Sequence, residues 1–242
     1  MKKRSKRYQK ITQQLEGIEK NSASKEEKTA VKQKFYEIPE AINTLKQLPP
    51  IKFDATVDLV MRLGIDAQKS EHQMRGSLSL PKGIGKTRKV IVFASGNEAE
   101  QARTSGADEV GVEDLIKKIE GGWTDFDVAI APPSLMKQVS KLGKILGPSG
   151  KMPSPKTGTV TNEIAVAVKE FKAGKIEYRT DVSGNIHVPV GKISFSPDDL
   201  QANIVSIIEY IKSHRPAGVK GDFIRGITIS STMGPGLQLK IK

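Results

Sequence analysis

The chain has 242 residues, of which 37% are hydrophobic and 27% charged, so it can fold around a real core and is long enough for one domain or two. It contains no cysteine, which excludes disulfides, thiolate metal sites and cysteine nucleophiles and agrees with a reducing, cytoplasmic setting. The net charge of +12 favours a polyanion as partner, because clustered lysines and arginines bind phosphates and release counterions; a merely well-solvated basic protein is the alternative. No stretch approaches the roughly 18 apolar residues of a membrane span, so no membrane partner is expected.

The first part of the chain predicts a basic extension followed by a helix. Residues 1–31 are polar, six of the first ten are basic, and Ile11, Leu15 and Ile18 form a weak helical stripe. A firmer helix is predicted between residues 38 and 48, because a proline stands in its first turn and two prolines follow it.

Two strands and an exposed connection are predicted next. Residues 51–59 alternate between apolar and polar side chains, which is the pattern of a half-buried strand. A second strand is expected at residues 74–80. The glycines and lysines of residues 81–89 then predict an exposed connection.

The middle of the chain alternates apolar runs with helical segments. The runs at residues 90–94 and 126–131 are continuous, as in strands that helices bury on both faces, and a shorter strand is expected at residues 109–111. The helices are expected at residues 97–104, at residues 112–119 and from Ser134 onward. This pattern predicts parallel βαβ units in a Rossmann-like, three-layer α/β/α domain.

A basic segment rich in glycine and proline follows. Residues 143–159 predict a long loop, and its Lys144, Lys151 and Lys156 either contact phosphates or belong to a solvated connection. A helix is expected at residues 162–173.

The alternating pattern returns in the last third of the chain. Residues 175–179 and 186–190, joined by a Ser183-Gly184-Asn185 turn, predict a β-hairpin. The clearest helix runs from Pro197 to Ser213, with Ser196 as its N-cap and an apolar face made of Leu200, Ile204, Ile207, Ile208 and Ile211. A strand at residues 223–229 and a final short strand follow it. Because the strands on either side of the middle block share a half-exposed character, we infer an α/β fold of two domains: an outer α+β domain built from both chain ends and the inserted Rossmann-like domain.

Sequence motifs for catalysis are absent or incomplete. Gly85-Lys86-Thr87 resembles the end of a phosphate-binding P-loop, but Leu80 stands where its first glycine is required. The three histidines, His72, His187 and His214, have no metal-ligand spacing. We therefore predict no catalytic residue, no metal and no cofactor. A nucleotide-dependent enzyme built on the Rossmann-like block remains the competing hypothesis.

Two short segments have the composition of an RNA-binding surface. Residues 230–234 combine three hydroxyls, a methionine and a glycine, which suit contacts with ribose, phosphate and bases, although a strand end with a turn explains them as well. Residues 52–58 offer a lysine, Phe53 as a stacking platform and small polar side chains. Phe53 also belongs to the apolar stripe of the predicted strand, which favours a packing role on pattern alone.

Several motifs, in order along the chain, resemble one family closely, the L-one proteins of the large ribosomal subunit. The resemblance extends from about Ile51 to Leu239. It rests on KFDATV from Lys52, RGSLSLPKGIGK from Arg75, KLGKILGP from Lys141, MPSPKTGT from Met152, GKIEYR from Gly174 and STMGP from Ser231.

The resemblance implies a domain division and a function. It implies an outer RNA-binding domain of residues 32–83 plus 175–242 and an inserted domain of residues 84–174 on a two-stranded hinge. Residues 1–31 remain as an extension.

The outer domain is expected to hold ribosomal RNA in the mobile L-one stalk, which helps deacylated transfer RNA leave the exit site. The family's bacterial members also repress their own operon's messenger RNA. A cytoplasmic, ribosome-associated protein that is a monomer when free is expected. Carried over by residue, the RNA contacts would be Lys52, Phe53, Thr56, Asp58, Ser231, Thr232, Met233 and Gly234. A nonspecific basic nucleic-acid-binding protein is the remaining alternative.

Overall fold

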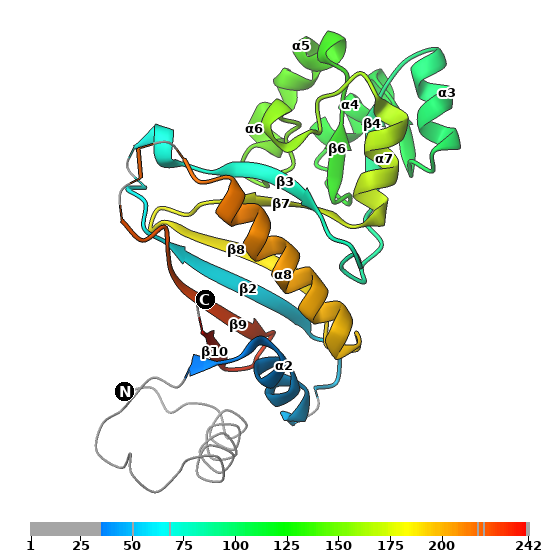
Figure 1. Cartoon of the computed structure of the whole chain (residues 1–242). Coiled ribbons are helices and arrows are strands. Elements are labelled where there is room, and N and C mark those ends of the chain that lie inside the picture. Colours follow the sequence, from blue (N-terminus) through cyan, green and yellow to red (C-terminus); the bar gives the residue numbers. More distant parts are fainter. Residues whose placement is uncertain (1–34, 50, 68, 217, 220, 241–242) are drawn as a thin grey trace, which may run out of the picture. The chain divides into compact units, whose positions relative to one another are not determined.

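The computed structural model describes residues 35–240 except residues 50, 68, 217 and 220 (Figure 1). The chain divides into two compact units: unit 1 comprises Met1–Gln73 and Thr180–Lys242, and unit 2 comprises Met74–Arg179. The predicted extension, residues 1–31, lies outside the described residues. The chain passes from one unit to the other twice, between residues 73 and 74 and between residues 179 and 180.

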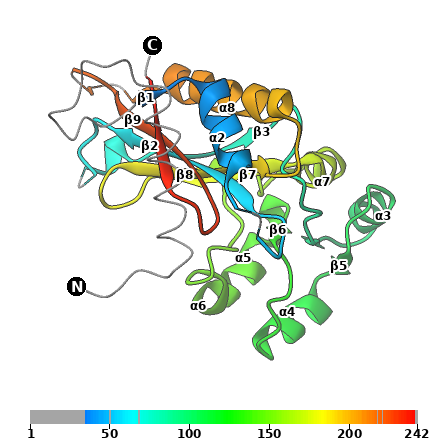
Figure 2. The same cartoon turned by 90° about the horizontal axis from the view of Figure 1, so that it is seen from below.

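Unit 1 contains a five-stranded sheet with two helices on one face (Figures 1 and 2). Strand β2 lies between β9 and β8 and is antiparallel to both. Strand β1 is a two-residue edge strand, which the sequence pattern did not predict. In sheet order the strands are β1 (Phe35–Tyr36), β10 (Gly236–Leu239), β9 (Ile224–Ser231), β2 (Thr56–Leu63) and β8 (Asn185–Lys192), and the helices are α2 (Ile38–Gln47) and α8 (Pro197–Ser213). A short 3-10 helix, η1 (Ser70–His72), also lies in this unit.

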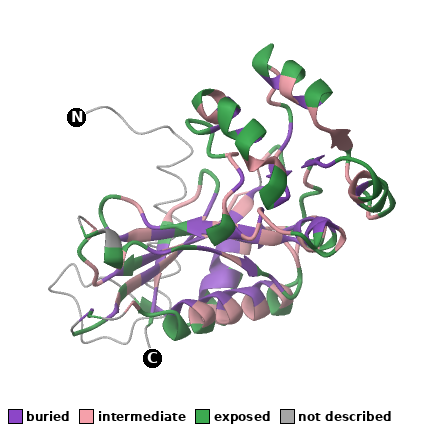
Figure 3. Cartoon of the chain, turned by 90° about the horizontal axis from the view of Figure 1, so that it is seen from above, coloured by how far each residue is buried: buried purple, intermediate pink, exposed green. Residues whose placement is uncertain are grey.

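Strand β2 shows how the sheet is built. Val57, Leu59, Met61 and Leu63 are buried, whereas the alternate side chains are half-buried or exposed, because successive residues of a strand point to opposite faces. Figure 3 shows the same division between buried and accessible residues along the sheet. The predicted strand at residues 51–59 is therefore wrong at its start, since regular pairing begins only at Thr56.

Helix α8 has the bounds predicted from the sequence. The hydroxyl of Ser196 accepts a hydrogen bond from the backbone N–H of Asp199 at 3.1 Å, which caps the helix. Leu200, Ile204, Ile207 and Ile211 are buried against the sheet, as their spacing predicted, whereas Ile208, which was also predicted to face the core, is only half-buried.

Unit 2 contains a three-stranded parallel sheet covered on both faces. The order is β5 (Glu109–Gly111), β4 (Val90–Phe93) and β6 (Val128–Ile130). Val90 and Val92 pack in a core with helices α3 (Asn97–Thr104) and α7 (Ile164–Ala173). Ile91 and Phe93 pack in a second core with α4 (Glu113–Glu120), α5 (Met136–Val139), the 3-10 helix η3 (Ser140–Leu142) and α6 (Gly143–Leu146). The continuous apolar runs therefore form strands buried on both sides, in three layers, as predicted.

The predicted loop at residues 143–159 is partly helical, so that prediction is wrong in part. It begins with α6 and contains a 3-10 helix, η4 (Pro155–Thr157), and another 3-10 helix, η2 (Pro133–Leu135), precedes α5. Thr157 and Thr159 are buried and their hydroxyls lie 3.0 Å apart, each bonded to the carbonyl of Ser154. Hydrogen bonds of these hydroxyls therefore give a defined conformation to a segment that its glycines and prolines predicted to be a loop.

The predicted β-hairpin is also wrong. Strand β7 (Lys175–Arg179) pairs with β3 (Arg75–Ser79) in a separate two-stranded sheet, and β8 pairs with β2 instead. The turn itself is present, because the Asp181 carboxylate accepts hydrogen bonds from the backbone N–H groups of Ser183 and Asn185. A turn fixes only the reversal of the chain, and the partners of each strand are set by residues far away in sequence.

Candidate functional site

The site lies where the start of β2 meets the end of β9. The backbone N–H of Thr232 donates to the carbonyl of Thr56 at 2.9 Å, and the N–H of Thr56 donates to the Thr232 hydroxyl at 3.1 Å. The N–H of Gly234 then donates to the carbonyl of Ser231 at 2.8 Å and closes a turn. The structure thus joins the two segments that the sequence singled out, although Thr56 and Thr232 are 176 residues apart.

Two large apolar side chains of these segments are exposed. Phe53 is 53% exposed and Met233 is 67% exposed. Phe53 precedes the regular part of β2, so it is released from the alternation that would have buried it, and the packing role suggested by its pattern is wrong. Exposing an aromatic ring and a thioether gains nothing for folding, so a binding role explains both better.

The backbone at Met233 is unusual. Its φ of 70° lies in the left-handed region, and it is the only non-glycine residue with a positive φ among the described residues. An L-residue in this region is disfavoured by about 1–2 kcal/mol. The turn therefore holds the Met233 side chain at the surface against a local backbone cost, which is typical of functional sites.

Polar side chains from the end of β8 complete the surface. The Lys192 ammonium donates to the Thr56 hydroxyl at 3.0 Å and to the carbonyl of Asp54 at 3.3 Å. The Asp54 carboxylate accepts from the Ser194 hydroxyl at 2.8 Å. Sequence reasoning missed Lys192 and Ser194. The available signal was that both residues directly follow a predicted alternating strand. The sequence does not show that they lie beside the start of β2, because this depends on the pairing of β8 with β2.

Asp58 is the titratable group of the site with a clear pKa shift. It lies on β2 opposite Ser230 of β9 and is half-buried. Burial raises the pKa of its carboxyl above the ordinary value, and the charges of His187 and Lys192 offset part of this effect. Lys52 is exposed beside Phe53, so a positive charge and an aromatic ring lie next to each other in the chain.

A cavity of about 380 Å³ opens beside Phe53. The Ser231 side chain, which is buried, borders it and packs against Gly234, where a Cβ atom would come within 2.2 Å of the Ser231 hydroxyl oxygen. A larger residue at position 234 would therefore force the Ser231 hydroxyl to move. The cavity is lined by Leu45, Lys46, Leu48, Pro49, Ile51, Phe53, Ala55, Ile193, Ser231 and Gly234.

The incomplete phosphate-binding motif and the basic segment 143–159 both use a lysine for contacts within unit 2. The Lys86 ammonium forms an ion pair with Asp127 at 2.8 Å, and the Lys151 ammonium donates to the carbonyl of Thr124, also at 2.8 Å. No group of three or more potential metal ligands occurs among the described residues. Within the same part of the chain, no helix is long and apolar enough to cross a membrane.

The candidate site thus combines an exposed ring and thioether with clustered hydroxyls and lysines on an α/β unit, which is the composition of a binding surface. Comparison with known proteins gives the family. The model of the Ribosomal protein L1p/L10e family matches residues 44–235. Two proteins called large ribosomal subunit protein uL1 are also similar. The protein from Kosmotoga olearia is 52% identical over 206 residues, which cover 85% of this chain and 89% of that protein. The protein from Fervidobacterium nodosum is 54% identical over 210 residues, which cover 86% of this chain and 89% of that protein.

The chain therefore belongs to the Ribosomal protein L1p/L10e family, and the resemblance seen in its motifs is confirmed. This is a family of structural ribosomal proteins, so the prediction that the chain is not an enzyme is confirmed as well.

Proposed function

We propose that the chain is a constituent of the large ribosomal subunit and binds the ribosomal RNA of the L-one stalk through the site at the ends of β2 and β9. The observation that carries the proposal is the exposure of Phe53 and Met233 beside the bonded pair Thr56 and Thr232. Family membership supports the ribosome as the setting.

The residues have complementary roles in this proposal. Phe53 stacks on an unpaired base, since base–aromatic stacking is worth about 1–3 kcal/mol, and Met233 makes a deformable apolar contact. Lys52 and Lys192 contact phosphates. The Thr232 hydroxyl oxygen and the carbonyl of Gly234 accept hydrogen bonds from ribose 2′-hydroxyls, which distinguishes RNA from DNA. Thr56 and Asp58 contribute the polar edge of the surface.

The family resemblance supports further roles, which we include in the proposal. The stalk moves and helps deacylated transfer RNA leave the exit site, and the same RNA site represses the messenger RNA of the protein's own operon by binding a mimic of the ribosomal segment. The protein is cytoplasmic and ribosome-associated, and is a monomer when free. The proposed division is an outer domain and a domain inserted at residues 84–174. The two chain crossings support the insertion itself, although they lie further out, at residues 73/74 and 179/180.

The test is a competition binding measurement. The purified full chain is titrated with the stalk segment of large-subunit ribosomal RNA, in excess unrelated RNA at about physiological ionic strength, which suppresses nonspecific binding. Retained tight binding is expected, and the variant Thr232→Val/Met233→Ala should weaken it. Val182→Ala is the matched control, because Val182 is an exposed apolar residue of unit 1 outside the site. Complete loss of binding to the competitor would leave a nonspecific basic protein and reject the proposal.

A further inference from the structure

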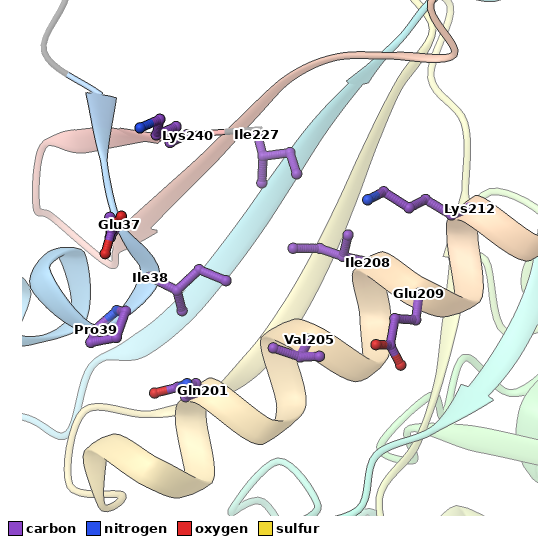
Figure 4. Close-up of a pocket in the computed structure, with 10 residues that line it drawn as sticks. All are labelled: Glu37, Ile38, Pro39, Gln201, Val205, Ile208, Glu209, Lys212, Ile227 and Lys240. Atoms are coloured by element: carbon purple, nitrogen blue, oxygen red, sulfur yellow. The ribbon is translucent and has the colours of Figure 1, made fainter. Parts of the chain in front are cut away.

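A long segment of unit 2 carries charge of one sign only. Residues 128–162 contain five lysines and no aspartate or glutamate. The hollow of about 290 Å³ between α2 and α8 in unit 1 differs, because both signs of charge border it (Figure 4). A surface of one sign attracts the opposite charge, so the segment in unit 2 is suited to an anionic partner. The charged residues around the hollow are Glu37, Glu209, Lys212 and Lys240.

Three of the five lysines lie in a row on one side of a helical stretch. Elements α5, η3 and α6 follow one another without a gap between Met136 and Leu146 (Figure 1). Lys137, Lys141 and Lys144 are exposed, and spacings of four and three residues place them on one side of the stretch. At 1.5 Å per residue, this lysine row is about 10 Å long. The other side of the stretch packs in the core through Val139, Leu142 and Leu146.

No acidic side chain of the described residues pairs with the lysine row. Other lysines of unit 2 lie close to acidic residues, and five of them form ion pairs within the unit, at distances between 2.5 and 3.3 Å. Positive charge that is used internally at those positions is left to bind an external anion in the lysine row. The paired lysines are Lys86, Lys89, Lys118, Lys172 and Lys175.

The polar neighbours of the lysine row indicate which anion fits. Gln138 and Ser140 are exposed between its lysines, and amide and hydroxyl groups bond sugar and phosphate oxygens of nucleic acids. The Ser140 hydroxyl donates to the carbonyl of Met136 at 2.6 Å, so its oxygen is left to accept a hydrogen bond, for which a ribose 2′-hydroxyl is a donor. The five aromatic residues of unit 2 are buried or half-buried, so a base has no exposed ring to stack on. These groups suit the sugar–phosphate backbone and not the bases.

We propose that the lysine row binds the backbone of RNA, whatever the base sequence. The chain belongs to a family of ribosomal proteins, so RNA is the polyanion of its setting. Each lysine contacts a phosphate as a point charge and releases counterions. The row shares no residue with the candidate site of unit 1. It is therefore a second RNA-binding surface, which does not depend on the function proposed for that site.

The test is the salt dependence of RNA binding by the full chain. A labelled RNA duplex of arbitrary sequence is titrated at salt concentrations from about 50 to about 200 mM, with the parent and with Lys137→Gln/Lys141→Gln/Lys144→Gln. Loss of three phosphate contacts should reduce the slope of log K against log salt by about 2.7. The parent's affinity should then fall about 40-fold more than the variant's over this range.

The matched control is Arg103→Gln/Lys117→Gln/Lys169→Gln. It removes the same charge from exposed positions on α3, α4 and α7, which, unlike the stretch of the lysine row, also carry acidic side chains. Its slope should equal the parent's. Thr232→Val/Met233→Ala should also leave the slope with this duplex unchanged, so failure of the unit 1 site is distinguishable from failure of the row.

Three outcomes contradict the proposal. An unchanged slope in the row variant would show that the row does not contact phosphates. Equal reductions in the row variant and the control would show that net charge alone is responsible. If the row variant loses affinity for polyglutamate but not for the duplex, the partner is an acidic protein.

Discussion

The two sheets of this protein bury their side chains in different ways. Strand β4 of unit 2 is buried along its whole length between two cores, whereas β2 of unit 1 alternates between buried and accessible side chains. A strand covered on both faces uses every side chain for packing. A sheet with its helices on one face leaves side chains and strand ends to contact other molecules, and the candidate RNA-binding site lies at such strand ends.

The largest effect is expected from an interior aromatic residue of unit 2. Phe171 is fully buried in the core of α3, α7 and the parallel sheet, so Phe171→Ala should lower the free energy of unfolding of unit 2 by about 3–5 kcal/mol. Chemical denaturation measures this change. RNA affinity measured below the unfolding transition should be unchanged, because the proposed RNA-binding site lies in unit 1. A loss of affinity under these conditions would contradict this separation of the unit 2 core from RNA binding.

An exposed aromatic residue should behave in the opposite way. Phe53→Ala should weaken binding of stalk RNA by about 1–3 kcal/mol, which is roughly 5- to 150-fold, and leave stability within about 0.5 kcal/mol. Titration and denaturation of the same preparation measure both. Phe35 is equally exposed but lies in β1, so Phe35→Ala serves as the control and should bind RNA normally. Equal losses in the two variants would contradict a stacking role for Phe53.

The turn at Met233 should separate stability from binding. Met233→Gly relieves the left-handed backbone and should raise the free energy of unfolding by about 0.5–1 kcal/mol, while RNA affinity falls because the thioether is lost. Met233→Leu keeps both the backbone cost and an apolar side chain, so its stability should equal that of the parent. A destabilised glycine variant would mean that the turn is not strained.

The smallest effect is expected at Asp58. Since burial raises its pKa in the folded chain, folding favours the protonated carboxyl, and this contribution is lost as pH rises through the folded-state pKa. Asp58→Asn should therefore stabilise unit 1 near neutral pH, by less than about 1 kcal/mol after solvent screening, and lose that advantage below about pH 4. Denaturation at several pH values measures the difference. An advantage that grows in acid would reverse the sign and reject this account.

Local patterns predicted most of the fold. Helix α8 was predicted with its cap and bounds because Ser196, Pro197 and the apolar spacing all act within one segment. The parallel strands were predicted because a continuous apolar run is itself the signal for burial on both faces. The predicted hairpin was wrong because β7 pairs with β3, whose residues lie about 100 positions away in sequence, and not with the neighbouring β8.

The candidate site could be predicted only in part from the residues themselves. Residues 230–234 and 52–58 both had a suggestive composition, and the family motif favoured a binding role for Phe53, whose apolar pattern had indicated packing. The strand starts at Thr56 and not at Ile51, which is why that pattern misled. Lys192 and Ser194 required the register between β2 and β8, which no local signal contains.

The hydrogen bonds between Thr56 and Thr232 also set an order of events during synthesis. All strands of unit 2 lie before residue 180, so unit 2 is complete while the last quarter of the chain is still being made. Strand β2 must wait for β9, because domains fold as units once their residues have emerged. The surface at the junction of these strands therefore arises only when translation is nearly finished. A chain that ends before β9 lacks this surface.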